Sequence, residues 1–271
     1  MATPIGNLAD LSPHAVDELA RADAIVCEDS RRAGKLLAHA GVPARELIVV
    51  HDHNESARAP MIVDRLGRGQ RIAVITDAGM PGVSDPGERL VRAVVAAGHR
   101  VEVVPGPSAA ITALVLSGLP TGRFVFEGFL PRKGSGRRER LRLLADERRT
   151  IVLHEAPHRL ARTLADLSEA LGPDRVIVIA RELTKTFEEV WRGTLEAACS
   201  RAQLGEARGE HVLVVAGAAE PRQPTDDQVR SALEAAAARG LSTKDASAAV
   251  AAELSVPKRR VYGLAVGSRG A

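Results

Sequence analysis

Short apolar runs alternate with longer amphipathic segments along most of the chain, and this alternation limits the fold more than any other feature. Runs rich in valine and isoleucine are typical of buried strands, and helix-length segments between them are typical of βα units. The sequence therefore predicts an α/β protein with a largely parallel sheet. Strands are expected at residues 24–28, 47–50, 71–75, 101–104, 124–128, 150–154, 175–180 and 211–217.

Two breaks in this alternation divide the chain. SGLPTG at 117–122 interrupts the pattern near the middle, and AAEPRQPTD at 218–226 precedes a segment without strand patterns. We therefore expect three parts: an N-terminal α/β domain at 1–117, a C-terminal α/β domain at 118–220 and a helical, basic tail module at 221–271.

The tail module carries the excess of positive charge. The chain has a formal net charge of +3, and from residue 222 onward eight basic side chains stand against five acidic ones, so the rest is neutral. That suits contact with phosphate, although a solvated helical surface would give the same count. Gly240, Ser242 or Thr243, and Pro257 indicate the boundaries of two or three short helices there.

Several classes of protein are disfavoured by what the sequence lacks. It shows no signal peptide and no apolar run of membrane-spanning length, and Cys27 and Cys199 lie far apart without a CxxC motif, so a cytoplasmic protein without membrane contact is expected. The fingerprints GxxxxGK[ST], GxGxxG and GxSxG are absent. Aromatic residues make up only 2% of the chain, so any nucleic acid would be bound by charge and shape.

Polar, glycine-rich segments follow the expected strand ends. In an open α/β sheet, ligands bind outside the carboxyl ends of the strands, so several such segments on one edge predict a binding site, although any single one could merely turn the chain. The most conspicuous is TDAGMPGVSDPG at 76–87, where Asp85 is expected to cap a helix that begins near Pro86. The others lie at 2–10, 27–32, 51–55, 105–110, 126–138, 154–159 and 181–189.

Two of these segments allow alternative interpretations. In HDHNE (51–55), His51, His53 and Glu55 share one side of an extended segment and could hold a metal, but a polar loop whose histidines form hydrogen bonds is the simpler interpretation, and no metal is expected. The basic run at 132–140 could contact phosphates or could be a solvated loop.

Taken in order, the segments ATPIGNLADLS, CEDSRR, HNE, DAGMPGVSDPGERLV, PGPSA, SGLP, FEGFLPRK, EAPHR and RELTKTFEE resemble the ribosomal RNA small subunit methyltransferase I family of the tetrapyrrole methylase superfamily. The resemblance covers nearly the whole chain. It implies two α/β domains of the tetrapyrrole methylase type with an active-site cleft between them, a helix-turn-helix-like tail module and a homodimer. The implied activity is S-adenosyl-L-methionine-dependent 2′-O-methylation of the ribose of cytidine 1402 in the decoding region of 16S rRNA, within the small ribosomal subunit.

The same resemblance assigns roles by position in the motifs. Asp77 is expected to meet a hydroxyl group of the cofactor. Contacts with S-adenosyl-L-methionine are expected from Thr3, Pro4, Ile5, Asp77, Ala78, Gly79, Met80, Val83, Ser84, Ser108, Ala109, Glu155, Ala156, Leu183 and Thr184. RNA contacts are expected from His53, Asn54, Arg132, Lys133, Arg137 and Arg138.

Lys185 and Glu182 are the catalytic candidates, because a ribose hydroxyl is a poor nucleophile until it is deprotonated. Lysine could lower the pKa of the hydroxyl, or act as the base if its own pKa is depressed. The alternative is that RELTK is an ion-paired structural turn.

The sequence departs from the family at three places. Family members carry a hydrophobic strand ahead of ATPIGNL, whereas Met1 directly precedes it here, so a shortened first strand is expected. Ser30 and Met80 stand where threonine is usual. Two other functions remain open: a methyltransferase acting on a tetrapyrrole or other small molecule, and an RNA-binding assembly factor without enzymatic activity.

Overall fold

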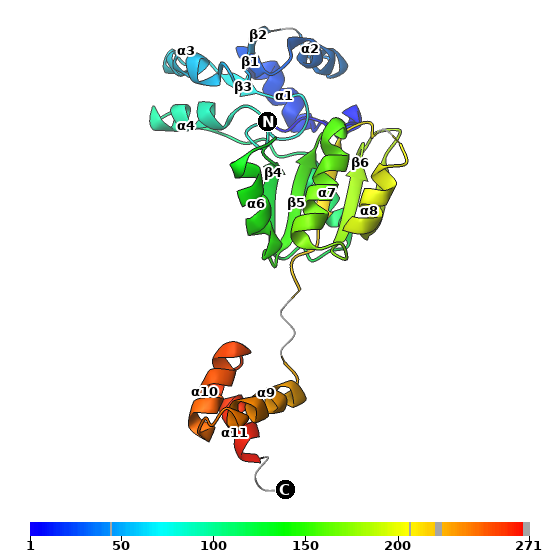
Figure 1. The fold of residues 1–271 in the computed structure, drawn as a ribbon. Helices are drawn as coiled ribbons and strands as arrows, with labels where there is room; N and C mark the ends of the chain where they lie inside the picture. Colours follow the sequence, from blue (N-terminus) through cyan, green and yellow to red (C-terminus); the bar gives the residue numbers. More distant parts are fainter. Residues whose placement is uncertain (44, 206, 220–223, 268–271) are drawn as a thin grey trace. The chain divides into compact units, whose positions relative to one another are not determined.

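The computed structural model describes residues 1–43, 45–205, 207–219 and 224–267. It divides into two compact units, Met1–Ala218 and Ala219–Ala271 (Figure 1). The first unit contains two β-sheets with helices packed against them, which confirms the expected α/β class. Because both sheets lie in this one unit, the domain boundary at 117/118 stays a prediction.

The first sheet has the order β2-β1-β3, and all its strands are parallel. Two helices pack on one face around Leu19 and Leu37, and two pack on the other face around Ile62 and Leu90. The strands are β1 (Ala24–Cys27), β2 (Glu46–Val49) and β3 (Ile72–Val74). The first face carries α1 (Pro13–Arg21) and α2 (Ser30–His39), and the second carries α3 (Glu55–Gly67) and α4 (Glu88–Ala96).

The strand expected at 101–104 is not formed. The amino group of Met1 donates to the carbonyl of Val74 (2.8 Å), and the backbone N–H of Ala2 donates to the carbonyl of Val104 (3.1 Å). Residues 1 and 2 therefore lie between these two segments. One backbone hydrogen bond to Val104 does not make a strand ladder, which needs a repeated series of such bonds.

The second sheet has the order β4-β5-β8-β6-β7 and is mixed. Only β4 and β5 are parallel, while the central strand β8 is antiparallel to both its neighbours, so the expectation of a largely parallel sheet is wrong for this half. As a result, the start of β8 lies at the same edge as the ends of β5 and β6. The strands are β4 (Phe124–Phe129), β5 (Thr150–Glu155), β6 (Val176–Arg181), β7 (Glu189–Thr194) and β8 (His211–Val215). The sequence pattern missed β7, whose EVWRGT alternates poorly.

Helices cover both faces of the second sheet, and Figure 1 shows the face that carries α6, α7 and α8. One face packs against α6 (Ser135–Ala145), α7 (Leu160–Leu171) and α8 (Leu195–Ala202). The other face packs against α5 (Ala109–Ser117), through Ala113 and Leu114. Thus α5 precedes the SGLPTG break in sequence but belongs to the core of the second sheet. Two short 3-10 helices complete the unit, η1 (Leu8–Asp10) and η2 (Pro157–Arg159).

Over its described residues, the second unit is a three-helix module with its own core, in which Val229, Val250 and Val261 are fully buried. Its helices are α9 (Asp226–Ala238), α10 (Thr243–Glu253) and α11 (Lys258–Gly267). The hydroxyl of Ser242, rather than that of Thr243, caps α10 by accepting from the backbone N–H of Asp245. In the part of the chain that the structure describes, no helix is long and apolar enough to cross a membrane.

Candidate functional site

The first loop of the chain meets the RELTK turn at Gly6. A Cβ atom built on Gly6 would lie 2.5 Å from Cγ of Lys185 and 2.7 Å from both the carbonyl oxygen of Leu183 and the hydroxyl of Thr184, so no side chain fits there. The hydroxyl of Thr184 also accepts a hydrogen bond from the backbone N–H of Asn7 (3.1 Å). These contacts connect the edge of the first sheet to the edge of the second.

The loop at 76–87 has a backbone that requires glycine at particular positions. Gly79 has φ of 80° and forms an isolated antiparallel bridge with Thr3. Gly87 has φ of 135°, and a Cβ added there would lie only 3.0 Å from the backbone nitrogen of Gly82. The bridge fixes this loop to the first loop of the chain. Both loops therefore approach the second sheet together.

Glu55, rather than Asp85, caps the helix that follows the 76–87 loop. Its side chain is buried, and one carboxylate oxygen accepts from the backbone N–H groups of Gly87 and Leu90, both at 2.9 Å. The expectation that Asp85 caps this helix is therefore wrong. Because its carboxylate binds these backbone groups, Glu55 does not act as a metal ligand together with His51 and His53 of the HDHNE segment. Within the described ranges, no group of three potential metal ligands is present.

A cavity of about 250 Å³, here called the Ser84 cavity, lies between the 76–87 loop and the second sheet. It brings together most of the expected cofactor residues, from both halves of the first unit. These are Ile5, Ala78, Gly79, Met80, Val83, Ser84, Ser108, Ala109, Glu155, Ala156 and Leu183. Its other lining residues include Asp85, Phe129, His154, Glu210 and His211.

A second cavity of about 270 Å³, here called the Lys185 cavity, adjoins the first and shares Ile5, Ala78 and Glu210 with it. It contains the remaining expected cofactor residues except one, namely Thr3, Pro4 and Asp77. Thr184 lines neither cavity. Three basic side chains line the second cavity: Arg32, Lys35 and Lys185.

Asp77 and Thr3 are held by hydrogen bonds within the protein. One carboxylate oxygen of Asp77 accepts from the backbone N–H of Asp29 (3.3 Å), and the other lies 3.4 Å from the guanidinium of Arg32. The hydroxyl of Thr3 donates to the carbonyl of Thr76 (3.1 Å). Asp77 therefore faces the Lys185 cavity, so its expected contact with the cofactor stays a prediction.

The Ser84 cavity contains several ionisable groups in a poorly solvated position. Burial, followed by the nearby carboxylates of Glu28 and Asp77, raises the pKa of Asp85 to about 7. Burial lowers the pKa of His154, and burial together with Arg181 lowers that of His211. Among the residues that the structure describes, His154 Nε2 and His211 Nδ1 are buried without a hydrogen-bond partner. The cavity thus has polar atoms available for a ligand.

Lys185 forms two ion pairs at the edge of its cavity. Its ammonium donates to Glu182 (2.9 Å) and to Glu210 (2.8 Å). Burial alone would lower the pKa of Lys185, but the hydrogen bonds to Glu210 and Glu182 outweigh it and hold the pKa above its usual range. Lys185 therefore carries a positive charge. This fits the expected role of lowering the pKa of the ribose hydroxyl, and does not fit the role of a general base.

Glu182 is built into the turn and lines neither cavity. Its backbone has φ of 51°, in the left-handed region. Burial acts to raise its pKa, but hydrogen bonds from the backbone of Glu210 and from Lys185 lower it overall. These contacts fit the ion-paired structural turn better than a group that meets substrate.

Glu155 belongs to a buried network that includes one of the expected RNA-binding residues. One of its oxygens accepts from the backbone N–H of Ala156 (2.9 Å) and lies 3.1 Å from Arg159, and the other accepts from the hydroxyl of Thr163. The guanidinium of Arg137 donates to Thr163 (3.0 Å), and also to Asp166 and the carbonyl of Pro131.

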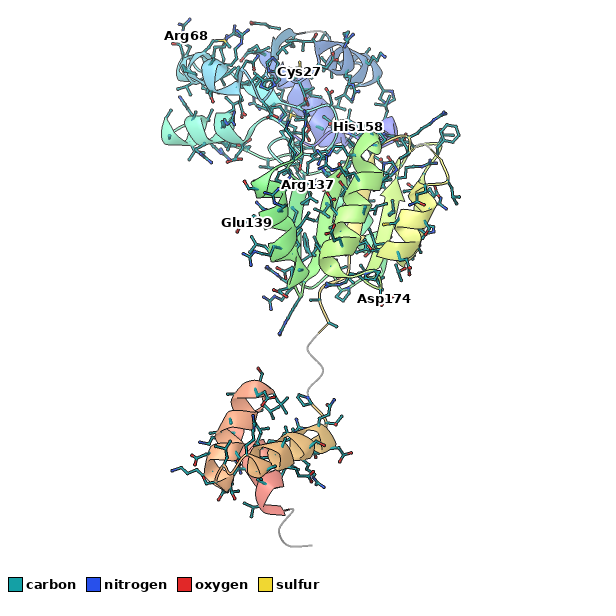
Figure 2. The ribbon with its side chains drawn as sticks, viewed as in Figure 1. Cys27, Arg68, Arg137, Glu139, His158 and Asp174 are labelled. Carbon is teal, nitrogen blue, oxygen red and sulfur yellow. The ribbon has the colours of Figure 1, made fainter. Side chains whose placement is uncertain are left out.

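Arg137 is 3% exposed, and all three of its guanidinium nitrogens donate to groups inside the protein. The expected RNA contact of Arg137 is therefore wrong, and its role is structural. Arg137 and Glu139 lie on the same helix, α6, but Glu139 is on its exposed side (Figure 2). A run of arginines in sequence does not reveal which member faces inward. The other basic candidates of this segment are exposed, as is His53: Arg132, Lys133 and Arg138. Asn54 instead holds its own loop by accepting from the backbone N–H of His51 (2.9 Å).

Several lining residues lie outside the motifs that predicted the site. Phe129 is 48% exposed and its ring packs edge-on to that of His154, with centroids 5.6 Å apart. Glu210 precedes β8, and a search restricted to the ends of strands passes over it because β8 runs antiparallel. Lys35 lies one helical turn after Arg31 on α2. The helical pattern predicts an exposed position there, which by itself does not indicate a binding residue.

Comparison with known proteins agrees with this geometry. The family Tetrapyrrole (Corrin/Porphyrin) Methylases matches residues 2–199 of the chain. A protein of Synechocystis sp. called Ribosomal RNA small subunit methyltransferase I is 46% identical over 268 residues, covering 98% of this chain and 96% of its own. The chain belongs to the ribosomal RNA small subunit methyltransferase I family of tetrapyrrole methylases.

A further relative carries the same name, and a solved structure has the same fold. A Xylella fastidiosa protein of the same name is 51% identical over 222 residues, covering 81% of each chain. Among solved structures, the methyltransferase CobJ superposes with a TM-score of 0.60 at 24% identity, over 81% of this chain and 93% of its own. At that identity, the structural match shows the fold alone, which is the tetrapyrrole methylase fold expected from the sequence motifs.

Gly6→Ala should destabilise the first unit, because the added methyl group would overlap atoms of the RELTK turn. We expect a loss of roughly 1–3 kcal/mol in the free energy of unfolding, measured by urea denaturation. Gly34→Ala is the matched control: it lies in α2 with open space around its Cβ, so it should be neutral or stabilising by up to about 1 kcal/mol. Equal effects of the two substitutions would contradict the close approach at Gly6.

Asp85→Asn should change how stability depends on pH. A carboxyl group whose pKa rises to about 7 on folding favours the folded state when protonated, so its contribution to stability is lost as pH rises from about 4 to about 7. The asparagine variant lacks this loss, so its stability relative to the wild type should be greater at pH 8 than at pH 5, by comparison of urea midpoints. Asp174→Asn, on an exposed loop (Figure 2), is the control. Parallel pH curves for Asp85→Asn and the wild type would contradict the assigned pKa.

Proposed function

We propose that this protein methylates the ribose 2′-hydroxyl of a decoding-region cytidine, cytidine 1402 of 16S rRNA in the small ribosomal subunit, with S-adenosyl-L-methionine as the donor. The observation that carries the proposal is the pair of adjoining cavities, one lined by cofactor motifs and one lined by basic side chains. Relatives that cover 98% and 81% of the chain are named Ribosomal RNA small subunit methyltransferase I, which supports methylation of small-subunit rRNA. The proposed place of action is the cytoplasm, where the small subunit is assembled.

The residues of the Ser84 cavity fit a sulfonium cofactor. S-adenosyl-L-methionine supplies an electrophilic methyl group on a positively charged sulfur. The apolar wall formed by Ile5, Leu183 and the alanines fits an uncharged body, while Asp85 provides an acidic group near a positive charge. The unpartnered nitrogen atoms of His154 and His211 are available to polar groups of the ligand.

The Lys185 cavity fits the sugar and phosphate of a nucleotide. Lys185, Arg32 and Lys35 give it positive charge, and phosphate is the anion that such side chains bind in RNA. Lys185, held as an ammonium, stabilises negative charge that develops on the ribose oxygen. Glu182 positions Lys185 through its 2.9 Å hydrogen bond.

Contacts with the rest of the RNA are proposed for exposed basic and polar residues. The exposed side chains of Arg132, Lys133, Arg138 and His53 are available for phosphate, and Asn54 holds the loop that presents His53. The three-helix module supplies further basic side chains. Such contacts position the RNA by charge and need no aromatic platform.

One experiment tests the function directly. The protein is incubated with methyl-labelled S-adenosyl-L-methionine and unmethylated small subunits, and label is mapped by nuclease digestion and mass spectrometry. We expect label in a 2′-O-methylcytidine of the decoding region. Lys185→Ala should bind the cofactor with an unchanged dissociation constant but transfer label at least about 100-fold more slowly.

The alternative functions give different results in the same assay. Binding to subunits without transfer would support an RNA-binding assembly factor, and transfer only to a small acceptor would support a tetrapyrrole or other small-molecule methyltransferase. Label in a base rather than a ribose would contradict the proposed position of methylation.

We also propose that the protein acts as a homodimer. The helix α5 is apolar all round: Ala113 and Leu114 are buried against the second sheet, while Ile111 and Val115 on its outer side are 47% and 69% exposed. Val101 and Val103 in the segment that precedes it are exposed as well. Exposed apolar side chains of this kind fit a partner surface.

Light scattering should therefore give about twice the chain mass of 28.7 kDa. Val115→Glu should shift the protein towards the monomer, because it would bury a charge in the interface. Val176→Glu, an exposed valine on β6, is the control and should leave the mass unchanged. A monomeric wild type would contradict this proposal.

A further inference from the structure

A single carboxylate stands where the two cavities meet. Glu210 lines both the Ser84 cavity and the Lys185 cavity, together with Ile5 and Ala78. Among the residues that the structure describes, it is the one ionisable side chain common to both walls. A group that moves from a ligand in one cavity to a ligand in the other must pass this junction.

The backbone of Glu210 is fixed by Glu182. The N–H of Glu182 donates to the carbonyl of Glu210 (3.0 Å), and the N–H of Glu210 donates to the carboxylate of Glu182 (2.9 Å). The preceding Gly209 has φ of 79°, and a Cβ there would lie 2.5 Å from Cγ of Glu182. The start of β8 is therefore held tightly against the RELTK turn.

The side chain of Glu210 uses one oxygen and leaves the other available. Its Oε2 accepts from the ammonium of Lys185 at 2.8 Å, whereas no hydrogen bond to Oε1 is present among the described residues. The charge of Glu210 also acts on both cavities: it helps to raise the pKa of Lys185 and of Asp85, and it opposes the lowering of the pKa of His154.

The other ionisable groups are less well placed to take a proton at the junction. Lys185 already holds its proton, and both Lys185 and Asp77 line only the second cavity. Glu182 lines neither cavity, and one of its oxygens is occupied by both Lys185 and the backbone of Glu210. Asp85 and the two histidines line only the Ser84 cavity.

We propose that Glu210 is the catalytic residue that accepts the proton of the ribose hydroxyl during methyl transfer. This inference rests on the proposed function. In the step, the hydroxyl oxygen forms a bond to the methyl carbon and the carbon–sulfur bond of the sulfonium donor breaks. The bonding pair stays on sulfur, which leaves a neutral thioether, and the hydroxyl proton passes to the free oxygen of Glu210.

Glu210→Gln separates this role from the positioning of Lys185. The glutamine amide oxygen can still accept a hydrogen bond from the ammonium, but the amide cannot take the proton. We expect kcat for transfer to small subunits to fall at least about 100-fold, with the dissociation constant for S-adenosyl-L-methionine within about twofold of the wild type by calorimetry. The wild-type rate should fall towards low pH, where a carboxylate base is protonated, and the Glu210→Gln rate should lack this fall.

Two control variants make the kinetic result decisive. Glu196→Gln, on the exposed side of α8, should behave as the wild type. Asp85→Asn should keep the fall in rate towards low pH. If Asp85→Asn lost this fall in rate while Glu210→Gln kept it, the assignment to Glu210 would be overturned. A Glu210→Gln rate within about threefold of the wild type would overturn it as well.

A second readout does not depend on activity. Glu210→Gln should lower the pKa of Lys185, because the ammonium loses one of its two carboxylate partners. The pKa is measured by NMR titration of the isotope-labelled lysine. An unchanged titration of Lys185 would show that Glu210 does not stand at this junction and would refute the inference. If the wild type does not label small subunits but the pKa of Lys185 shifts as expected, the proposed function is wrong and so is the catalytic role of Glu210, while the contact between Glu210 and Lys185 is confirmed.

Discussion

The close approach of Gly6 to the RELTK turn is the contact on which the site depends. It brings the first loop of the chain, which is bridged to Gly79 through Thr3, within van der Waals contact of Leu183 and Thr184. The hydrogen bond from Asn7 to Thr184 and the packing of Ile5 against the second sheet hold the same loop in place. Both cavities include Ile5, the residue next to Gly6, so their common wall is set by this contact.

Much of the site could be predicted from the sequence because loops after parallel strands collect at one edge of a sheet. The segment 76–87 follows β3 in the first sheet and 154–159 follows β5 in the second, so each lies at the carboxyl edge of its own strand, and both line the Ser84 cavity. What the sequence could not show was which side chains are already used. Asp85 has the spacing of a helix cap, but Glu55, far earlier in the chain, performs that task, and Arg137 resembles its exposed neighbours while it is buried.

The direction of β8 explains the largest omission. Apolar periodicity identifies a buried strand but does not say whether it runs parallel or antiparallel to its neighbours. Because β8 is antiparallel, its first residues share an edge with the last residues of β5 and β6: His211 is paired with Glu155 and with Arg181. A residue placed before a strand, such as Glu210, can then belong to the same site as residues placed after strands.

The geometry of the RELTK turn shows how such a site is held in place. Glu182 and Thr184 have left-handed backbones, which cost roughly 1–2 kcal/mol each for residues with a Cβ. Against this, the carboxylate of Glu182 accepts from the backbone N–H of Glu210 and from the ammonium of Lys185, and hydrogen bonds to charged groups contribute about 1.5–3 kcal/mol each. The backbone N–H of Glu182 also donates to the carbonyl of Glu210, a neutral bond that contributes about 0.5–1.5 kcal/mol. The bonds outweigh the strain, so the turn is stable in a conformation that its residues would not adopt alone. The same hydrogen bonds that stabilise the strained backbone of Glu182 also place Lys185 and Glu210 beside each other.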